Sequence, residues 1–179
     1  MLHYRMTFAN ISDFEKTSDY LPILNGSIMA DLIVLFIVYY TPYFNSKFLM
    51  KYYEEYRLGA IIADVLILVI GMILTRYFYY KIFETYSLGK FIGLSLVIQI
   101  IHDYLFYLFF SNVPVGVNKF LDMFKDYAKE VTTGAILGDS FMMVVSVLFS
   151  SYFASKTQHM NVISLIVMVY LIPYILYTR

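Results

Sequence analysis

The sequence predicts an all-α integral membrane protein, a bundle of about five transmembrane helices in one domain. Composition is the first reason: 60% of the residues are apolar and 15% are charged, whereas soluble domains carry about 25% charged residues. The second reason is a set of five apolar stretches, each near the roughly 20 residues with which a helix crosses a bilayer core. These stretches are residues 22–42, 57–80, 90–111, 134–154 and 160–177.

The chain divides into a short polar tail and one transmembrane domain. Residues 1–20 are polar and predict a tail outside the membrane, and residues 21–179 form the transmembrane domain. The tail lacks the basic start and the apolar stretch of a secretory signal peptide. We therefore expect no cleaved signal peptide, and a first span that stays in the membrane as an anchor.

The linker at residues 112–133 is the longest between the spans and predicts a short amphipathic helix. Phe120, Phe124, Tyr127 and Val131 recur in it at helical spacing, with charged residues at the other positions. Such a helix lies in the membrane interface, or it covers the end of the bundle as a soluble loop helix. Docking of a partner protein is a third interpretation.

Composition also excludes several classes of function. Without cysteine, the chain has neither disulfides nor thiolate metal sites. Its net charge is zero, and it has no long basic run with which to bind nucleic acid. No set of nucleophile, base and orienting group can be assembled, so we expect no enzymatic activity and no cofactor. Lysine and arginine are spread evenly over the two sides, which leaves the membrane orientation open.

A six-residue segment that begins with glycine and ends with aspartate occurs three times in the apolar stretches. The copies are Gly26–Asp31, Gly59–Asp64 and Gly134–Asp139, and a fourth aspartate, Asp103, follows His102 in another stretch. An ionised carboxylate in hydrocarbon costs at least about 2.5–3.5 kcal/mol, so each needs a partner, a wet cavity or a proton. Similar packing requirements explain the three copies more simply than an ancient repeat does.

Three of the aspartates are expected at one depth in the membrane. Asp64 and Asp139 lie in spans that enter from the same side, about 8–10 Å below the interface at 1.5 Å per residue. Asp103 is at a similar depth because its span runs in the opposite direction and ends shortly after it. This predicts one polar layer inside the bundle. Its members are Asp64, Gln99, His102, Asp103 and Asp139.

Four further polar residues are secondary candidates. Thr75 and Ser146 continue narrow polar stripes that begin at the aspartates of their spans, and such stripes face the interior of a bundle. Asp31 lies near the middle of the first span and is expected to stand apart from the layer. Arg76 could pair with Asp31, or its side chain could extend to the end of its own span.

The layer has two main interpretations, and two others are weaker. The aspartates could be structural, bonded to polar groups across helices, or they could form a proton or cation pathway with His102 as relay. His102 and the aspartates would suit a divalent ion, but no spaced ligand motif supports a metal. An intramembrane aspartyl protease is discounted because Ile136 replaces the first glycine of the Gly-x-Gly-Asp signature ending at Asp139, and no span carries a Tyr-Asp motif.

Four segments together resemble a family of viral proteins. They are Ile100–Phe110, Phe124–Glu130, Gly134–Met143 and Tyr170–Tyr177. They are similar to uncharacterised multispanning membrane proteins encoded by large DNA viruses of algae and other protists. The resemblance spans roughly residues 90–177 and transfers no catalytic residues. It implies a viral origin and a location in the virion's internal membrane or in a host-cell membrane.

The expected function follows from the resemblance and the layer together. The first expectation is a structural or assembly component of a virion or infected-cell membrane. Its partners would be the lipid bilayer, and a second copy or other viral membrane proteins. The alternative is a small proton- or cation-conducting transporter or channel that uses the layer of aspartates and His102.

Overall fold

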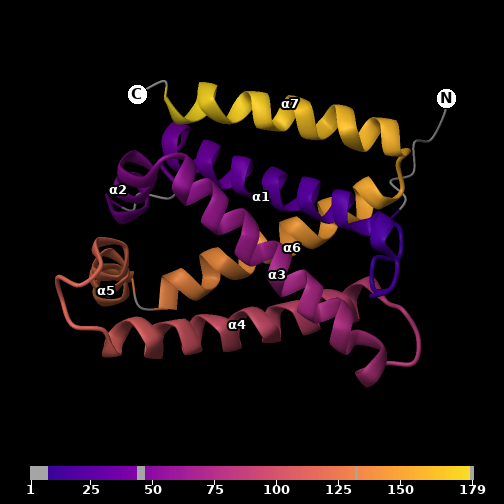
Figure 1. The fold of residues 1–179 in the computed structure, drawn as a ribbon, viewed down its shortest axis with the longest axis horizontal. Helices are drawn as coiled ribbons and strands as arrows, with labels where there is room; N and C mark the ends of the chain where they lie inside the picture. The colour runs from indigo at the N-terminus through magenta and orange to yellow at the C-terminus, as the bar shows by residue number, and fades with distance from the viewer. Residues whose placement is uncertain (1–7, 44–46, 132, 178–179) are drawn as a thin grey trace.

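A computed structural model describes residues 8–43, 47–131 and 133–177 of the chain, without the side chains of residues 129–135. Residues 1–7 of the predicted tail lie outside this part. The described backbone forms seven α-helices after a short 3-10 turn (Figure 1). They are α1 Tyr20–Tyr40, α2 Lys47–Tyr56, α3 Leu58–Ile82, α4 Leu88–Asn112, α5 Lys119–Val131, α6 Thr133–Ala154 and α7 Gln158–Leu176.

Five of these helices, α1, α3, α4, α6 and α7, are long and apolar enough to cross a membrane. They coincide closely with the five predicted spans, because a run of about 20 apolar residues has few other stable conformations in a bilayer. The predicted all-α membrane bundle is thus confirmed. The chain has the architecture of a multi-pass membrane protein.

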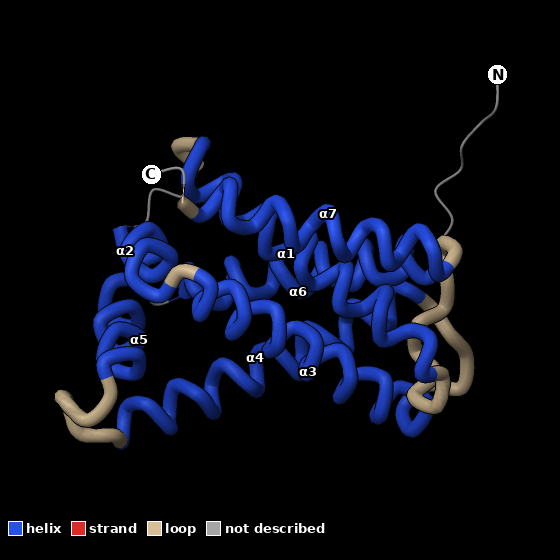
Figure 2. Tube along the Cα trace, turned by 45° about the horizontal axis from the view of Figure 1, so that its top comes forward, coloured by secondary structure: helices blue, strands red, loops and turns tan. Residues whose placement is uncertain are grey.

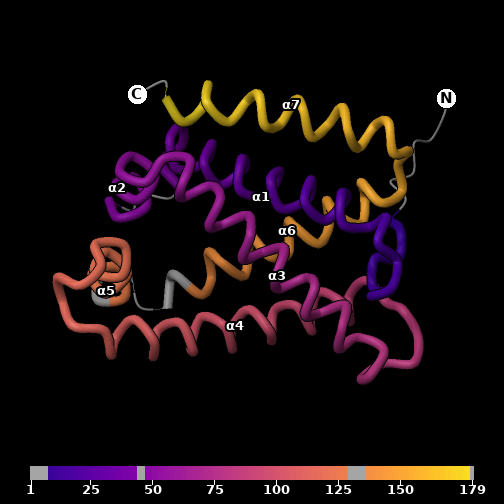
Figure 3. The backbone as a smooth tube through the Cα atoms, viewed as in Figure 1, coloured from indigo at the N-terminus to yellow at the C-terminus, as the bar shows by residue number. Residues whose placement is uncertain are grey.

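Helix α1 lies at the centre of the bundle. It packs against α6, α7 and α3, while α4 packs against α6 and α3. Figures 1 and 3 show α7 and α4 on opposite sides, with α1 and α6 between them. Central packing makes α1 the most buried of the five spans and α4 the least buried. The outer helices carry large exposed apolar side chains, as expected of surfaces that face lipid.

Small residues bring α1 and α6 into close contact. Gly26 lies against the backbone of α6 at Ser150, and the Ser27 and Ser146 hydroxyls are hydrogen-bonded at 3.0 Å. Small side chains and hydroxyls are what membrane helices use to approach closely. Ser146, one of the secondary candidates, therefore serves helix packing. Thr75 is buried and donates to the carbonyl oxygen of Gly71 in its own helix, at 2.8 Å.

Helix α2 was not predicted from the sequence, in which residues 43–56 only connect the first two predicted spans. Phe48, Tyr52 and Tyr53 are buried on one side of it, while Lys51 and Glu54 are exposed on the other. It joins α1 to α3, and α5 joins α4 to α6, so both short helices lie at the same end of the bundle (Figure 2).

Helix α5 packs its aromatic face against the bundle. The ring of Phe124 lies 5.2 Å from that of Phe106 in α4, and the ring of Phe120 lies 4.8 Å from that of Tyr56 in α2. Aromatic contacts at these distances contribute beyond the area they bury. The apolar face of the predicted amphipathic helix thus meets protein, and α2 and α5 together close this end of the bundle.

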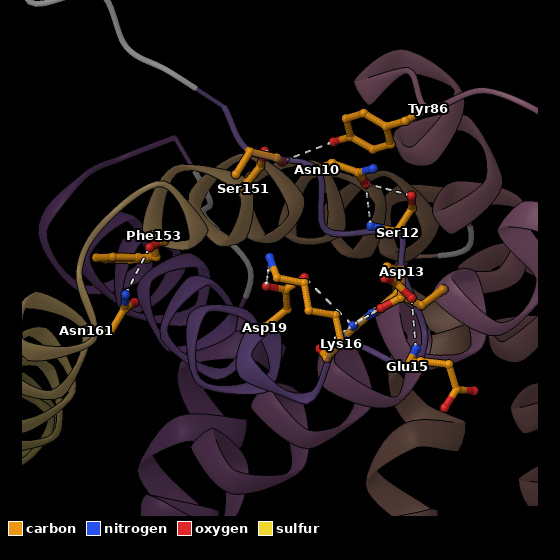
Figure 4. Close-up of polar contacts among 12 residues, drawn as sticks. Asn10, Ser12, Asp13, Glu15, Lys16, Asp19, Tyr86, Ser151, Phe153 and Asn161 are labelled. Atoms are coloured by element: carbon orange, nitrogen blue, oxygen red, sulfur yellow. Dashed lines mark hydrogen bonds and ion pairs between the residues drawn. The ribbon is translucent and has the colours of Figure 1, made fainter.

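The described part of the N-terminal segment folds back onto the opposite end of the bundle and is not a free tail. Ile11 and Ser12 are fully buried, and the Ala9 amide donates to the carbonyl oxygen of Ser151 in α6 at 3.0 Å. Figure 4 shows the polar contacts of this segment, including the turn at Ser12 and the ion pair of Lys16 with Asp19.

Arg76 of α3 holds this segment, contrary to both sequence interpretations. Its guanidinium donates to the carbonyl oxygens of Asp13 and Lys16 and lies 3.8 Å from the Asp19 carboxylate. The side chain is 1% exposed. It therefore neither pairs with Asp31 nor extends to the aqueous boundary, because the folded-back segment supplies its acceptors inside the protein.

Candidate functional site

A cavity of about 210 Å³ lies beneath α2 and α5, between α3, α4 and α6. That volume is enough for several water molecules. All five residues of the predicted layer line it. The complete lining is Tyr52, Ala63, Asp64, Ile67, Leu68, Gln99, His102, Asp103, Phe106, Phe120, Phe124, Asp139 and Met142. No lysine or arginine occurs among these residues of the described chain, so the cavity is acidic.

The α4 side of the cavity is a chain of three polar side chains. Gln99 lies one helical turn before Asp103 and donates from Nε2 to its Oδ1 at 2.7 Å. Nδ1 of His102 is 3.2 Å from the same oxygen, and its ring stacks on Phe106. The other oxygen, Asp103 Oδ2, is buried and has no hydrogen-bond partner among the described residues. One side of this carboxylate is thus held firmly while the other can accept a further donor.

Asp64 on α3 is bound by two phenol groups from α2. Tyr52 donates to Oδ1 at 2.9 Å, and the Tyr53 hydroxyl lies 3.1 Å from Oδ2. Burial is the main reason that the pKa of both tyrosines lies far above the usual value of a phenol, and the nearby carboxylates are the second reason. Both phenols therefore keep their hydrogens at neutral pH and act as donors to Asp64.

Asp139 on α6 completes the acidic wall. It lies within electrostatic range of Asp103 and Asp64 and lines the same cavity. Two further spaces extend the site from here, one smaller and one larger than the cavity. A space of about 80 Å³ reaches from Asp64 and Asp139 towards Tyr53, and a mainly apolar hollow of about 530 Å³ reaches from Asp103 and Asp139 along α4 and α5.

Asp31 is joined to this site, so the expectation that it stands apart is wrong. The Tyr53 hydroxyl lies 3.1 Å from Asp31 Oδ1 as well as from Asp64. Asp31 is fully buried, and its second oxygen has no partner among the described residues. The connection depends on α2, which brings a tyrosine between two helices that enter from opposite sides. Thr75, Arg76 and Ser146 do not line the cavity.

Sequence reasoning missed Tyr52 and Tyr53, although a signal for them exists. Phe48, Tyr52, Tyr53 and Tyr56 follow the i, i+4, i+5, i+8 spacing of one helix face, and the charged residues Lys51, Glu54 and Glu55 lie between them. That pattern is typical of an amphipathic helix. The acceptors of the Tyr52 and Tyr53 hydroxyls, Asp64 and Asp31, become apparent only in the folded chain.

The described residues contain no group of three or more His, Cys, Asp or Glu placed to hold a metal ion. The carboxylates surround a space instead of converging on one point. The arrangement can accept protons and stabilise a positively charged group within the cavity. Comparison of the chain with protein-family models, with curated proteins and with solved structures finds no match. The resemblance to viral membrane proteins therefore stays a prediction, and the function is argued from the site itself.

Proposed function

We propose that this multi-pass membrane protein transfers protons or small monovalent cations, with the acidic cavity as its binding site. The observation that supports this most is the cavity itself, lined by Asp64, Asp103, Asp139 and His102 and by no described lysine or arginine. Ionisable residues in a membrane domain commonly mark the path of a proton or an ion, and acidic linings select cations. Aspartates that only tied helices together would be expected in a dry, packed layer.

Protons are favoured over a tightly held metal ion. Asp64 accepts a hydrogen bond from a phenol group, and Asp103 accepts one from an amide group. The described residues contain no group of three or more such side chains placed to hold a metal ion. Proton transfer needs such hydrogen-bonded carboxylates with water between them, and does not need a closed coordination shell. The viral membrane implied by the sequence resemblance is the setting that we propose for this activity.

Replacement of the cavity carboxylates is expected to abolish most of the flux. Asp64→Asn and Asp139→Asn keep the side-chain shape but remove the group that binds the proton. We expect either change to slow acidification of proteoliposomes by about 10²-fold, the lower end for loss of a positioned proton-transfer group. The measurement is the fluorescence of an entrapped pH dye after a potential is imposed.

Glu54→Gln is the matched control for this experiment, because Glu54 is exposed on α2 and does not line the cavity. Its flux should equal that of the wild type. If the wild type shows no flux, or if the aspartate variants leave the flux unchanged while lowering thermal stability, the transfer proposal fails. The aspartates would then have the structural role, and an assembly function would be the better proposal.

The water content of the cavity can be tested separately with single cysteines, since the chain has none of its own. Ala63 lines the cavity, whereas its neighbour Ile62 is 57% exposed on the outer face of α3. We expect Ala63→Cys to react much faster than Ile62→Cys with a small charged thiol reagent. The reactive thiolate forms in water and not in hydrocarbon. Equal rates at these two positions of the same depth would mean that the cavity is dry.

A further inference from the structure

The hydroxyl of Tyr53 lies between two carboxyl groups that belong to different helices. It is 3.1 Å from Oδ1 of Asp31 on α1 and 3.1 Å from Oδ2 of Asp64 on α3. Tyr53 is 1% exposed and Asp31 is fully buried. Both distances are hydrogen-bond distances, in a place shielded from solvent.

For both contacts to be full hydrogen bonds, these three groups need one hydrogen more than a phenol and two ionised carboxylates supply. A phenol has one hydrogen to donate, and an ionised carboxylate can only accept. If both aspartates were ionised, Tyr53 could satisfy one of them, and its other contact would bring two lone pairs together. The Tyr52 hydroxyl does not supply the missing hydrogen, because it donates to the other oxygen of Asp64, at 2.9 Å.

We infer that Asp31 and Asp64 share one proton through Tyr53. Two phenol donors stabilise a negative charge on Asp64, whereas Asp31 has one contact and a second oxygen without a partner in the described chain. The proton therefore rests on Oδ1 of Asp31, which donates to the Tyr53 oxygen, and Tyr53 donates to Asp64. The other ionisable groups that face the pair are Tyr52 on α2 and Asp139 on α6.

This arrangement gives a proton a path between the cavity and the interior of the bundle. The O–H bond of Asp31 breaks as its proton binds the Tyr53 oxygen, and the original hydrogen of Tyr53 moves to Oδ2 of Asp64. Tyr53 ends as it began, while the negative charge moves from Asp64 to Asp31. As a path this step rests on the proposed proton transfer, but the shared proton does not depend on it.

Infrared spectroscopy of the full-length protein in nanodiscs, with carboxyl-labelled aspartate, tests the shared proton. At neutral pH the difference between the wild type and Asp31→Asn should contain the carbonyl band of a protonated carboxyl group. That band should shift to higher frequency in Tyr53→Phe, which removes one hydroxyl and keeps the buried ring. Absence of the band from the Asp31→Asn difference would overturn the inference, and so would an unchanged band in Tyr53→Phe.

Tyr52→Phe is the matched control, since it removes a neighbouring hydroxyl that contacts Asp64 but is not placed between the two aspartates. The band should persist in this variant, and its loss there would contradict the assignment to Tyr53. Proton flux is measured in the same set, where Tyr53→Phe should be slower than Tyr52→Phe by about tenfold or more. If the infrared results hold and the wild type shows no flux, the shared proton stands and the transfer function fails.

Discussion

Gly26→Ala is expected to lower the free energy of unfolding by about 1–3 kcal/mol, the range for overpacking a close contact. A Cβ atom at this position would lie 2.2 Å from the Ser150 hydroxyl oxygen, 2.5 Å from the Ser150 amide nitrogen and 2.7 Å from the Ser146 carbonyl oxygen. The hydroxyl can rotate away, but the two backbone atoms cannot move without separating α1 from α6. The Ser27–Ser146 hydrogen bond would be lost with that separation.

Gly59→Ala is the matched control, because Gly59 opens the second copy of the same sequence segment. A Cβ atom there meets no other atom within 4 Å, and alanine favours a helix over glycine by up to about 1 kcal/mol. Its stability should be equal to that of the wild type or slightly higher. Thermal unfolding in detergent, followed by circular dichroism, measures both variants. Equal midpoints for Gly26→Ala and Gly59→Ala would show that the α1–α6 contact is looser than described.

The different roles of these two glycines show what the recurring segment does and does not predict. Its aspartates were informative, since Asp64 and Asp139 line one cavity and Asp31 is joined to them by Tyr53. The glycines were not informative, because the same residue at the same place in the segment meets α6 in one case and open space in another. The side-chain surroundings of Gly134 lie outside the described part of the chain.

Features that depend on residues close together in the chain could be predicted from the sequence, and features that depend on contacts between distant segments could not. The five spans were predictable because hydropathy acts within each segment, and the depth of Asp103 followed from the rise of a helix and the direction of its span. Helix α2 was not found because ten residues with balanced polarity give no membrane signal. The side on which α5 packs could not be decided, since its aromatic face suits lipid and protein equally well. That choice depends on Tyr56 and Phe106, which only the folded chain brings near it.

Replacement of the buried Arg76 is expected to have the second large effect on stability. Arg76→Met is expected to destabilise the fold by about 3 kcal/mol, the lower end for removing one partner from a buried charged pair. Methionine fills a similar space, but the carbonyl oxygens of Asp13 and Lys16 lose their donor. The lower end applies because the buried Asp19 carboxylate keeps Lys16 as a partner at 2.8 Å. Arg76→Lys should recover only part of the loss, since one ammonium group cannot reproduce the planar fork of donors.

Loss of Arg76 should loosen the N-terminal segment more than the rest of the fold. This difference distinguishes a specific anchor from a general contribution to packing. In Arg76→Met the amides of residues 9–19 should exchange with deuterium much faster than in the wild type, while those of α1 change little. Lys81→Met removes the same charge from an exposed site on the same helix and should leave this exchange unaltered. If residues 9–19 stay equally protected in both variants, the segment is held by Ile11 and by the Ala9–Ser151 contacts. Arg76 would then be a buried charge whose stabilising partner is not the N-terminal segment.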